Sequence, residues 1–362
     1  MTPSAGATGL IETPLARGSA DVMFVSLGTT IGLQVADAQF IAGLRAAGLE
    51  VEVVHVPKQR RDVPTLMLTD LLQAWRSRVA VKAALDRIVP RALVYSTTTA
   101  ALLAPPGRAI RFDALAQRSR PGRHGLWQRP LERFRLRRAP LLLPWDAASL
   151  DGAPDDAAKR AVVVPVPVDA TDVATGVAPE GVAITYAADA AKKGLDRLLA
   201  AWAIAHRDGE RLVVTGRTTL PDEFADVEGV DCIGQLPPAD FRRAVASIGV
   251  LAIAPRREDY GLVQLEALAA GARVVTTTAP GPYAALPLIR ELWPEQVVDD
   301  ADDPVALAAA LRHAIDARAA EAAADAQNDE DRARAREAVA PWAPDAVLAQ
   351  IERDVVPRLL DH

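Results

Sequence analysis

Short apolar runs of strand length alternate with longer helical patterns along nearly the whole chain. The strand-like runs include "ADVMFVSLG", "LEVEVVHVP" and "RALVYSTTTAALLA" in the first half, and "GVAITYA", "ERLVVTG", "GVLAIAP" and "ARVVTTT" in the second. Patterns of helical spacing, such as "QVADAQFIAGLRAAG" and "GLDRLLAAWAIAHRDG", separate them. Strands that alternate with helices are typical of parallel α/β layers. The sequence therefore predicts an α/β fold with two doubly wound sets of layers.

The length of 362 residues exceeds one ordinary core and fits two domains of common size. A stretch rich in Pro, Asp and Ala follows "AVVVPVPVDA" and is expected to link them. We expect a flexible tail over residues 1–20 and a Rossmann-like domain over 21–165. A second Rossmann-like domain is expected over 166–340, and a C-terminal helix over 341–362 is expected to pack back on the first domain.

Composition narrows the class of protein. Half of the residues are hydrophobic and 24% are charged, which is typical of a globular protein, and the formal charge of −6 gives no global reason to expect nucleic acid. The single cysteine, Cys232, excludes an intrachain disulfide and is expected in the core. No apolar run reaches the roughly 18 residues of a membrane span, and the first residues lack the features of a secretory signal. The cytoplasm is the expected location.

The stretch "REDYGLVQLEALAAGARVV" places two glutamates, Glu258 and Glu266, in a strand–loop–helix–strand pattern. Glu258 falls in the loop after a buried strand, and Glu266 falls inside the helix that Gly261 opens. Doubly wound domains bind ligands at the carboxyl ends of their strands. The backbone amides of Tyr260, Gly261 and Leu262 would lie at a helix N-terminus, which suits a phosphate group. Carboxylates on either side of that turn could accept hydrogen bonds from hydroxyls, as in a nucleoside diphosphate that bears a sugar.

This stretch resembles the Glu-x7-Glu signature of retaining glycosyltransferases with the two-domain GT-B architecture. "KKGLDRLLAAW" is similar to the lysine–glycine segment of that family, "CIGQL" to its nucleobase loop, and "VVVPVPVDA" to the segment that leads into its second domain. The resemblance is specific over about Val162–Thr278 and only architectural in the first domain. It implies GT-B architecture, with two Rossmann-like domains that face a central cleft.

The resemblance also implies roles for single residues. Glu258 would contact hydroxyls of the donor sugar, Glu266 would bind the ribose, and Lys193 would meet the diphosphate as it departs. The base pocket would be lined through backbone groups by Gly216, Gly234 and Leu236. The loop that begins at Gly28 would lie across the diphosphate, although a plain tight turn is the alternative there. The alternative for the two glutamates is a helix cap and a surface residue, and for Lys193 an exposed lysine at the start of a helix.

Two departures from the family pattern concern catalysis. The family carries Gly-Arg shortly before the Lys-Gly, whereas "TYAADAAKKG" has Ala187 and Ala188 there. Either Lys192 or Arg217 replaces that arginine, or the protein is slow or inactive. The family also tends to have a histidine at the end of a strand of the first domain, where "AIRFDAL" places Asp113. Asp113 would orient the acceptor hydroxyl or accept its proton; alternatively it is the partner of an arginine such as Arg111.

Eight arginines lie between Arg118 and Arg138 in a protein whose net charge is negative. Three interpretations remain open: a solvated helix whose arginines pair with acidic residues, a site for a phosphorylated acceptor, or a surface for anionic lipid. Candidates on the acceptor side within this segment are Arg123, His124 and Trp127. Trp127 would stack on a sugar ring or anchor the segment in apolar surroundings.

The functional hypothesis is transfer of a sugar from a nucleotide-diphosphate sugar to a hydroxyl of a glycan, lipid or small metabolite. The resemblance implies retention at the anomeric carbon and neither an obligatory metal nor another cofactor. The partners would be the donor, the acceptor and an anionic membrane surface, with no nucleic acid. The alternatives are a nucleotide-sugar-binding protein without transferase activity and a nucleotide-sugar epimerase on the same scaffold.

Overall fold

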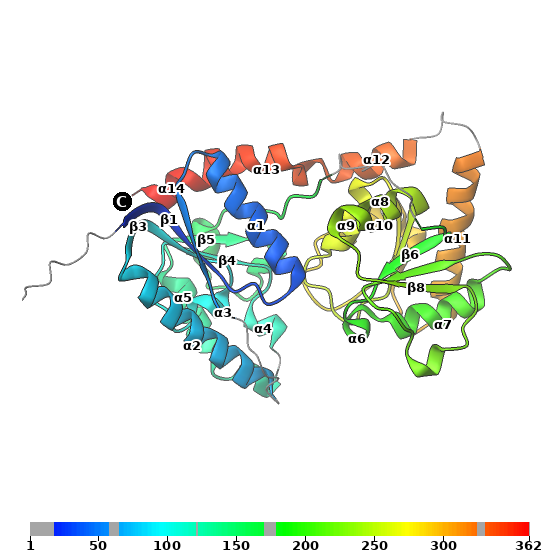
Figure 1. Cartoon of the computed structure of the whole chain (residues 1–362), viewed down its shortest axis with the longest axis horizontal. Coiled ribbons are helices and arrows are strands. Elements are labelled where there is room, and N and C mark those ends of the chain that lie inside the picture. Colours follow the sequence, from blue (N-terminus) through cyan, green and yellow to red (C-terminus); the bar gives the residue numbers. More distant parts are fainter. Residues whose placement is uncertain (1–17, 58–64, 121, 170–178, 324–329, 362) are drawn as a thin grey trace, which may run out of the picture.

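The computed structural model describes residues 18–57, 65–120, 122–169, 179–323 and 330–361. These residues form two α/β domains that lie next to one another, each built on its own sheet (Figure 1). Every strand pair in both sheets is parallel. The expectation of two parallel α/β domains is confirmed.

The first sheet has the strand order β2-β1-β3-β4-β5. Its strands are β1 (Gly18–Ser26), β2 (Val51–His55), β3 (Ile88–Tyr95), β4 (Ala109–Phe112) and β5 (Leu141–Pro144). β1 starts within the segment expected as a tail, so residues 18–20 belong to a strand instead, and the rest of that segment lies outside the described residues. The inner strand β4 and the edge strand β5 are buried throughout, as expected for strands covered on both faces.

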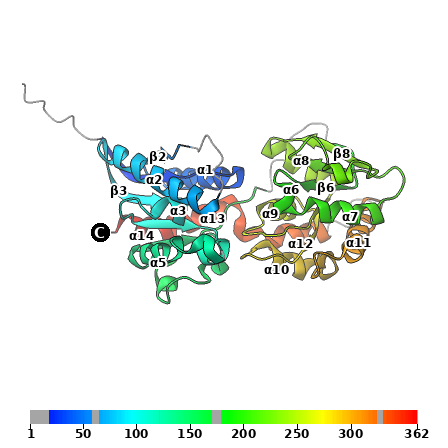
Figure 2. The ribbon, with the colours of Figure 1, turned by 90° about the horizontal axis from the view of Figure 1, so that it is seen from below.

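Helices cover both faces of the first sheet (Figure 2). They are α1 (Ile31–Ala46), α2 (Leu66–Leu85), α3 (Thr98–Ala101), α4 (Ala116–Ser119), α5 (Gln128–Arg138) and the single turns η1 (Gly122–Gly125), η2 (Ala147–Leu150) and η3 (Ala157–Arg160). Three threonines, Thr30, Thr65 and Thr97, set where α1, α2 and α3 begin. Each threonine side chain accepts a hydrogen bond from a backbone N–H in the first turn, which satisfies one of the helix's unpaired donors.

The second sheet has the strand order β11-β10-β9-β6-β7-β8. Its strands are β6 (Ala183–Tyr186), β7 (Leu212–Thr215), β8 (Val230–Gly234), β9 (Val250–Ile253), β10 (Arg273–Thr277) and β11 (Val297–Val298). Its helices are α6 (Ala190–Lys193), α7 (Leu195–Ala205), α8 (Pro238–Ile248), α9 (Leu262–Ala269), α10 (Ala285–Leu292), α11 (Pro304–Ala323) and α12 (Glu330–Ala338), with the turns η4 (Asp222–Phe224) and η5 (Pro294–Gln296). β6 and β9 are neighbours, so the loops after them meet at one edge of the sheet.

An extended segment, residues 161–169, leads from the first sheet towards the second domain. The valines at 162, 164, 166 and 168 are buried, which follows the two-residue period of extended chain. The N–H of Val162 bonds to Leu142 beside β5, whereas the N–H of Val166 bonds to the hydroxyl of Tyr260 in the second domain. The segment thereby fixes one domain against the other.

The C-terminal elements return to the first domain (Figure 1). They are η6 (Ala340–Trp342), α13 (Pro344–Gln350), the π-turn η7 (Ile351–Val355) and α14 (Val356–Leu360). Apolar side chains on them join the core around β1 and α1, among them Val347, Ile351 and Val355. None of the helices in the described residues is both long and apolar enough to cross a membrane.

Candidate functional site

Lys193 and Glu258 form an ion pair where the carboxyl ends of β6 and β9 meet. The Nζ of Lys193 lies 2.6 Å from Oε2 of Glu258, and the two side chains are only 15% and 7% exposed. Lys193 is the last residue of α6, and Glu258 lies in the loop between β9 and α9. Removing both charges from water is unfavourable unless they pair, so the fold holds them together. The site therefore contains one cationic and one anionic side chain at a position where doubly wound domains bind ligands.

The backbone conformation at position 194 requires a glycine directly after Lys193. Its φ of +64° lies in the left-handed region, and a Cβ at this position would lie 1.8 Å from the carbonyl oxygen of Ala254. Only glycine allows the turn after α6 to pack so closely on the end of β9. This close approach brings Lys193 within reach of Glu258.

The loop after β10 supports Glu258 from the other side. The N–H of Glu258 donates to the carbonyl of Pro280 at 3.1 Å, and a Cβ on Gly281 would lie 2.0 Å from the carbonyl oxygen of Glu258. Gln264 of α9 is fully buried and donates through Nε2 to the hydroxyl of Tyr283 at 3.0 Å, with Oε2 of Glu258 at 3.5 Å. Sequence reasoning missed these supporting residues, although the Pro-Gly-Pro turn in "TTTAPGPYAAL" is a visible signal.

Asp259 is a second acidic residue of the site that sequence reasoning missed. Its carboxylate lies 3.4 Å from Nζ of Lys192 and 2.5 Å from the guanidinium of Arg257. The side chain of Arg257 also donates to the carbonyl of Arg118 in the first domain at 2.9 Å. The loop between β9 and α9 thus carries two arginines followed by two acidic residues, and it contacts both domains.

The N-terminus of α9 presents unpaired backbone donors to the site. Gly261 caps the helix with a φ of +87°, and within the described residues the amides of Tyr260, Gly261 and Leu262 donate no hydrogen bond. The side chain of Tyr260 points away, because its hydroxyl accepts from the N–H of Val166 at 3.0 Å and from Nε1 of Trp342 at 2.8 Å. Free amides at a helix start attract anions.

Glu266 lies one turn inside α9 and is half-buried. Burial raises the pKa of Glu266 to about 7, and the positive charge of Arg242 on α8 opposes that rise. A carboxylate held in such an environment gains from any partner that donates hydrogen bonds to its ionised form. Glu266 is therefore not an ordinary solvated surface residue.

The remaining donor-side candidates lie at the ends of β7 and β8. The N–H of Gly216 donates to Gly234 at 2.8 Å, and the N–H of Gly234 donates to Arg217 at 3.0 Å. Both glycine amides are therefore engaged, which leaves carbonyl oxygens and the half-buried Leu236 to meet a ligand. The side chain of Arg217 donates to the carbonyl of Thr219 in its own loop, whereas Lys192 lies beside Asp259. Lys192 is thus the better placed of the two replacements considered for the missing arginine.

Asp113 approaches this loop from the first domain. It follows β4, is half-buried, and accepts a hydrogen bond from the N–H of Ala114 at 2.8 Å. Burial and the negative charge of Asp259 raise the pKa of Asp113, and the charge of Lys192 lowers it. The structure therefore places Asp113 in the electrostatic field of the loop that carries Glu258.

Arg111 is not an ion-pair partner of Asp113. Its guanidinium is fully buried between the rings of Phe40 and Trp145, at 4.9 and 4.7 Å, and its nearest carboxylate is that of Asp37 at 3.8 Å. Among the described residues, Asp113 forms no ion pair.

Comparison with known proteins agrees with this geometry. Residues 181–317 match the family model described as Glycosyl transferases group 1. We call these matched residues the group 1 domain. The match includes Lys193, Glu258 and Glu266 and ends before the C-terminal helices. No curated protein matches the chain.

Solved structures share the architecture of both domains. The glycosyltransferase WaaG, involved in lipopolysaccharide biosynthesis, aligns over 92% of this chain and 99% of its own, with a TM-score of 0.66 and 15% identity. Sucrose-phosphate synthase from Thermosynechococcus elongatus aligns over 92% and 97%, with a TM-score of 0.67 and 15% identity. The trehalose-6-phosphate protein from E. coli, bound with UDP-2-fluoro glucose, aligns over 92% and 99%, with a TM-score of 0.61 and 12% identity. The fold is GT-B, and the group 1 domain together with this fold supports a nucleotide-sugar-dependent glycosyltransferase.

The candidates of the arginine-rich segment lie outside the group 1 domain. Arg123 and His124 are exposed on η1, and Trp127 is half-buried just after it. Their turn contacts α2, and no hydrogen bond or ion pair joins these three side chains to Lys193, Glu258 or Asp113. The structure therefore does not bring them together with the ion pair.

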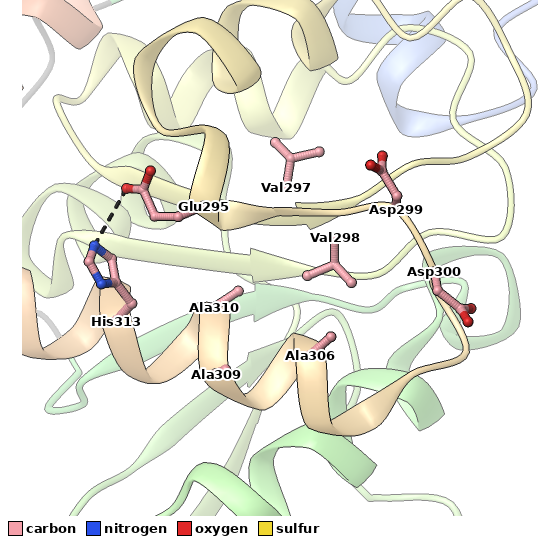
Figure 3. A pocket seen from close by; sticks show the side chains of 9 residues that line it. All are labelled: Glu295, Val297, Val298, Asp299, Asp300, Ala306, Ala309, Ala310 and His313. Atoms are coloured by element: carbon pink, nitrogen blue, oxygen red, sulfur yellow. Dashed lines mark ion pairs between the residues drawn. The ribbon is translucent and has the colours of Figure 1, made fainter.

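A surface depression in the group 1 domain is separate from this site (Figure 3). It lies between the edge strand β11 and α11, and its rim carries Glu295, whose carboxylate lies 3.5 Å from Nε2 of His313. β10 separates β11 from β9, so the depression is not formed by the loops that hold Glu258 and Lys193. Within the described residues, no group of three or more His, Cys, Asp or Glu side chains is arranged to hold a metal ion.

Proposed function

We propose that this protein transfers a sugar from a nucleotide-diphosphate sugar to a hydroxyl acceptor, with retention at the anomeric carbon. The observation that carries the proposal is the Lys193–Glu258 ion pair beside the free amides at the N-terminus of α9. Asp113 of the other domain is close enough to this loop to interact electrostatically with Asp259 and Lys192. A cation and unpaired amides suit a departing diphosphate, and a carboxylate suits sugar hydroxyls. One site thus has a partner for each part of the donor.

In this proposal the bond between the anomeric carbon and the phosphate oxygen breaks while a bond to the acceptor oxygen forms on the same face of the sugar, and the acceptor hydroxyl gives its proton to the carboxylate of Asp113. Lys193 and the amides of Gly261 and Leu262 stabilise the negative charge that develops on the diphosphate. Glu258 accepts hydrogen bonds from the sugar and Glu266 from the ribose, while the ends of β7 and β8 hold the base. No metal is required for these roles. Retention is tested directly by the anomeric configuration of the product.

The transferase is distinguished from its alternatives by turnover. A panel of UDP-, GDP-, ADP- and TDP-sugars is incubated with the protein, and release of the nucleoside diphosphate is measured with and without candidate acceptors. A protein that only binds the donor would release none, and an epimerase would change the sugar while it remains attached to the nucleotide. The alanines at 187 and 188 favour the binding protein as second candidate, and Lys192 beside Asp259 favours the enzyme.

Glu266 is expected to make nucleotide binding depend on pH. The hydrogen bonds of a ribose stabilise the ionised carboxylate, so binding lowers a pKa that burial has raised to about 7. Affinity for the nucleoside diphosphate should therefore rise as the pH rises through about 7. Calorimetry on the parent should show this slope, and Glu266→Gln should bind about 1–3 kcal/mol more weakly with little slope. An unchanged slope in Glu266→Gln would remove Glu266 from the ribose site.

Asp113→Asn is expected to keep the fold and donor binding but to lower transfer on the order of 10²-fold, the lower range for loss of a general base. Hydrolysis of the donor by water should fall less, because water needs no positioning by Asp113. The folded pKa of Asp113 is raised, so its negative charge destabilises the native state above the unfolded pKa, and removing it should leave the melting temperature unchanged or higher. A lower melting temperature with full transfer would instead assign Asp113 a structural role.

A further inference from the structure

One face of the first domain carries most of the large apolar side chains that the described residues leave exposed. They lie on α2 and on the segment from η1 to α5, and exposure reaches 55% at Trp75 and 64% at Leu126. The set is Met67, Leu68, Leu71, Trp75, Val79, Leu126 and Phe134. Steps of four residues along α2 place its members in one stripe on the outside of the helix.

The same elements carry a large excess of positive charge. α2 and residues 116–138 together hold eleven arginine and lysine residues against two acidic ones, Asp70 and Glu132. Both acidic side chains are buried: Asp70 pairs with Arg120 at 2.6 Å, and Glu132 accepts from the N–H of Ala116 at 2.9 Å. The charge that solvent meets here is therefore basic, in a chain whose net charge is −6.

The apolar stripe and the arginines belong to one surface, which we call the α2–α5 face. α2, α3 and α5 lie on the same side of the first sheet, and Figure 2 looks onto that side. The Asp70–Arg120 pair ties α2 to the arginine segment, and α2 contacts η1. Within the described residues, Arg123, Arg133 and Arg137 form no ion pair, which argues against the interpretation in which these arginines are neutralised by neighbouring acids.

We propose that the α2–α5 face docks on an anionic lipid bilayer. Arginines would lie at the level of the phosphates, while the α2 stripe with Trp75, Leu126 and Phe134 enters the interface between headgroups and acyl chains. A nucleic acid would satisfy the arginines but not the aliphatic side chains, which gain nothing from a phosphate backbone. The remainder of the chain is acidic, so an anionic surface orients the protein with this face towards the lipid. The docking does not depend on the proposed sugar transfer.

Flotation with lipid vesicles tests the docking on the full chain. Vesicles of phosphatidylcholine mixed with phosphatidylglycerol should bind the protein, and vesicles of phosphatidylcholine alone should bind it far more weakly. Arg133→Gln combined with Arg137→Gln should reduce partitioning about thirty-fold, since each surface arginine contributes about 1 kcal/mol. Trp75→Ser should reduce it about ten-fold, and this loss should persist at high salt because it is not electrostatic.

Matched controls are available on the chain. Ile204→Ser removes an equally exposed apolar side chain from the second domain. Arg353→Gln with Arg358→Gln removes two exposed charges from the C-terminal elements η7 and α14, which pack on the core around α1 and not on the α2–α5 face. Both controls should bind vesicles like the parent, and all variants should keep its melting temperature. Binding that ignores anionic lipid, or equal binding by Trp75→Ser and Ile204→Ser, would overturn the proposal. So would binding to heparin or single-stranded DNA without binding to vesicles.

Discussion

Lys193→Ala is expected to lower kcat on the order of 10²-fold or more, the effect of losing a donor that stabilises charge in the transition state. In the free protein the lysine is already held at the carboxyl edge of the second sheet, 2.6 Å from Glu258, by the turn at Gly194. A group fixed in advance needs no reorganisation when the diphosphate departs, which is why its loss should be large. The measurement is the rate of nucleoside diphosphate release at saturating donor.

Lys193→Ala is compared with Lys192→Ala, and the matched controls are Arg217→Ala and Lys159→Ala. The Nζ of Lys192 lies 3.4 Å from the carboxylate of Asp259 in the loop between β9 and α9, so we expect Lys192→Ala to lower kcat strongly as well. Arg217 bonds its own loop, and Lys159 lies on the surface of the first domain, so their substitution should change kcat little. Parent-like rates in Lys192→Ala would leave the helix amides and Lys193 alone to carry the charge of the leaving group.

Glu258→Gln is expected to lower kcat/KM for the donor about 10- to 150-fold, which corresponds to about 1.5–3 kcal/mol for hydrogen bonds to a charged group. Affinity for the free nucleoside diphosphate should stay nearly unchanged, because that ligand lacks the sugar that Glu258 binds. Kinetics with the intact donor and calorimetry with the diphosphate together separate the two effects.

Glu258→Ala adds a structural test of the same residue. It leaves Lys193 buried without its partner, which should destabilise the protein on the order of 3 kcal/mol, whereas Glu258→Gln retains a polar side chain beside the lysine. Gln264→Leu, which removes a neighbour of Glu258 but not the charge, should have a smaller effect on kcat/KM. Equal activity in Glu258→Gln and the parent would contradict the role of Glu258 in donor binding.

Much of the fold could be predicted from the sequence because the signals are local. Buried parallel strands such as "GVLAIAP" are continuous apolar runs. The helical pattern "QVADAQFIAGLRAAG" identified α1, although the cap at Thr30 starts that helix at Ile31, before the pattern begins. The strand–loop–helix pattern around Glu258 placed that carboxylate in a loop and Gly261 at the start of α9, where the structure has them. The expected boundary of the N-terminal tail was wrong, because residues 18–20 form the start of β1.

The candidate site was only partly predictable. Lys193 and Glu258 were identified separately, each from its own motif, but nothing local to either motif shows that their side chains form an ion pair. Asp259, Gln264 and Tyr283 were missed because an acidic residue beside a glutamate, or a polar residue on an apolar helix, has many ordinary explanations. Their position became clear only from the contacts that strand order creates.

The sequence by itself determined which segments form strands and helices, how many domains they make, and which residues follow the carboxyl ends of β6 and β9. These properties depend on hydrophobic period, on glycines with left-handed backbone and on helix caps, which all act within a few residues. Only the tertiary structure decided that Lys193 neutralises Glu258, that Arg111 stacks between aromatic rings instead of pairing with Asp113, and that α2 and α5 share one basic face. Each of these depends on the order of strands in a sheet and on the packing of two domains, which bring together residues that are far apart along the chain.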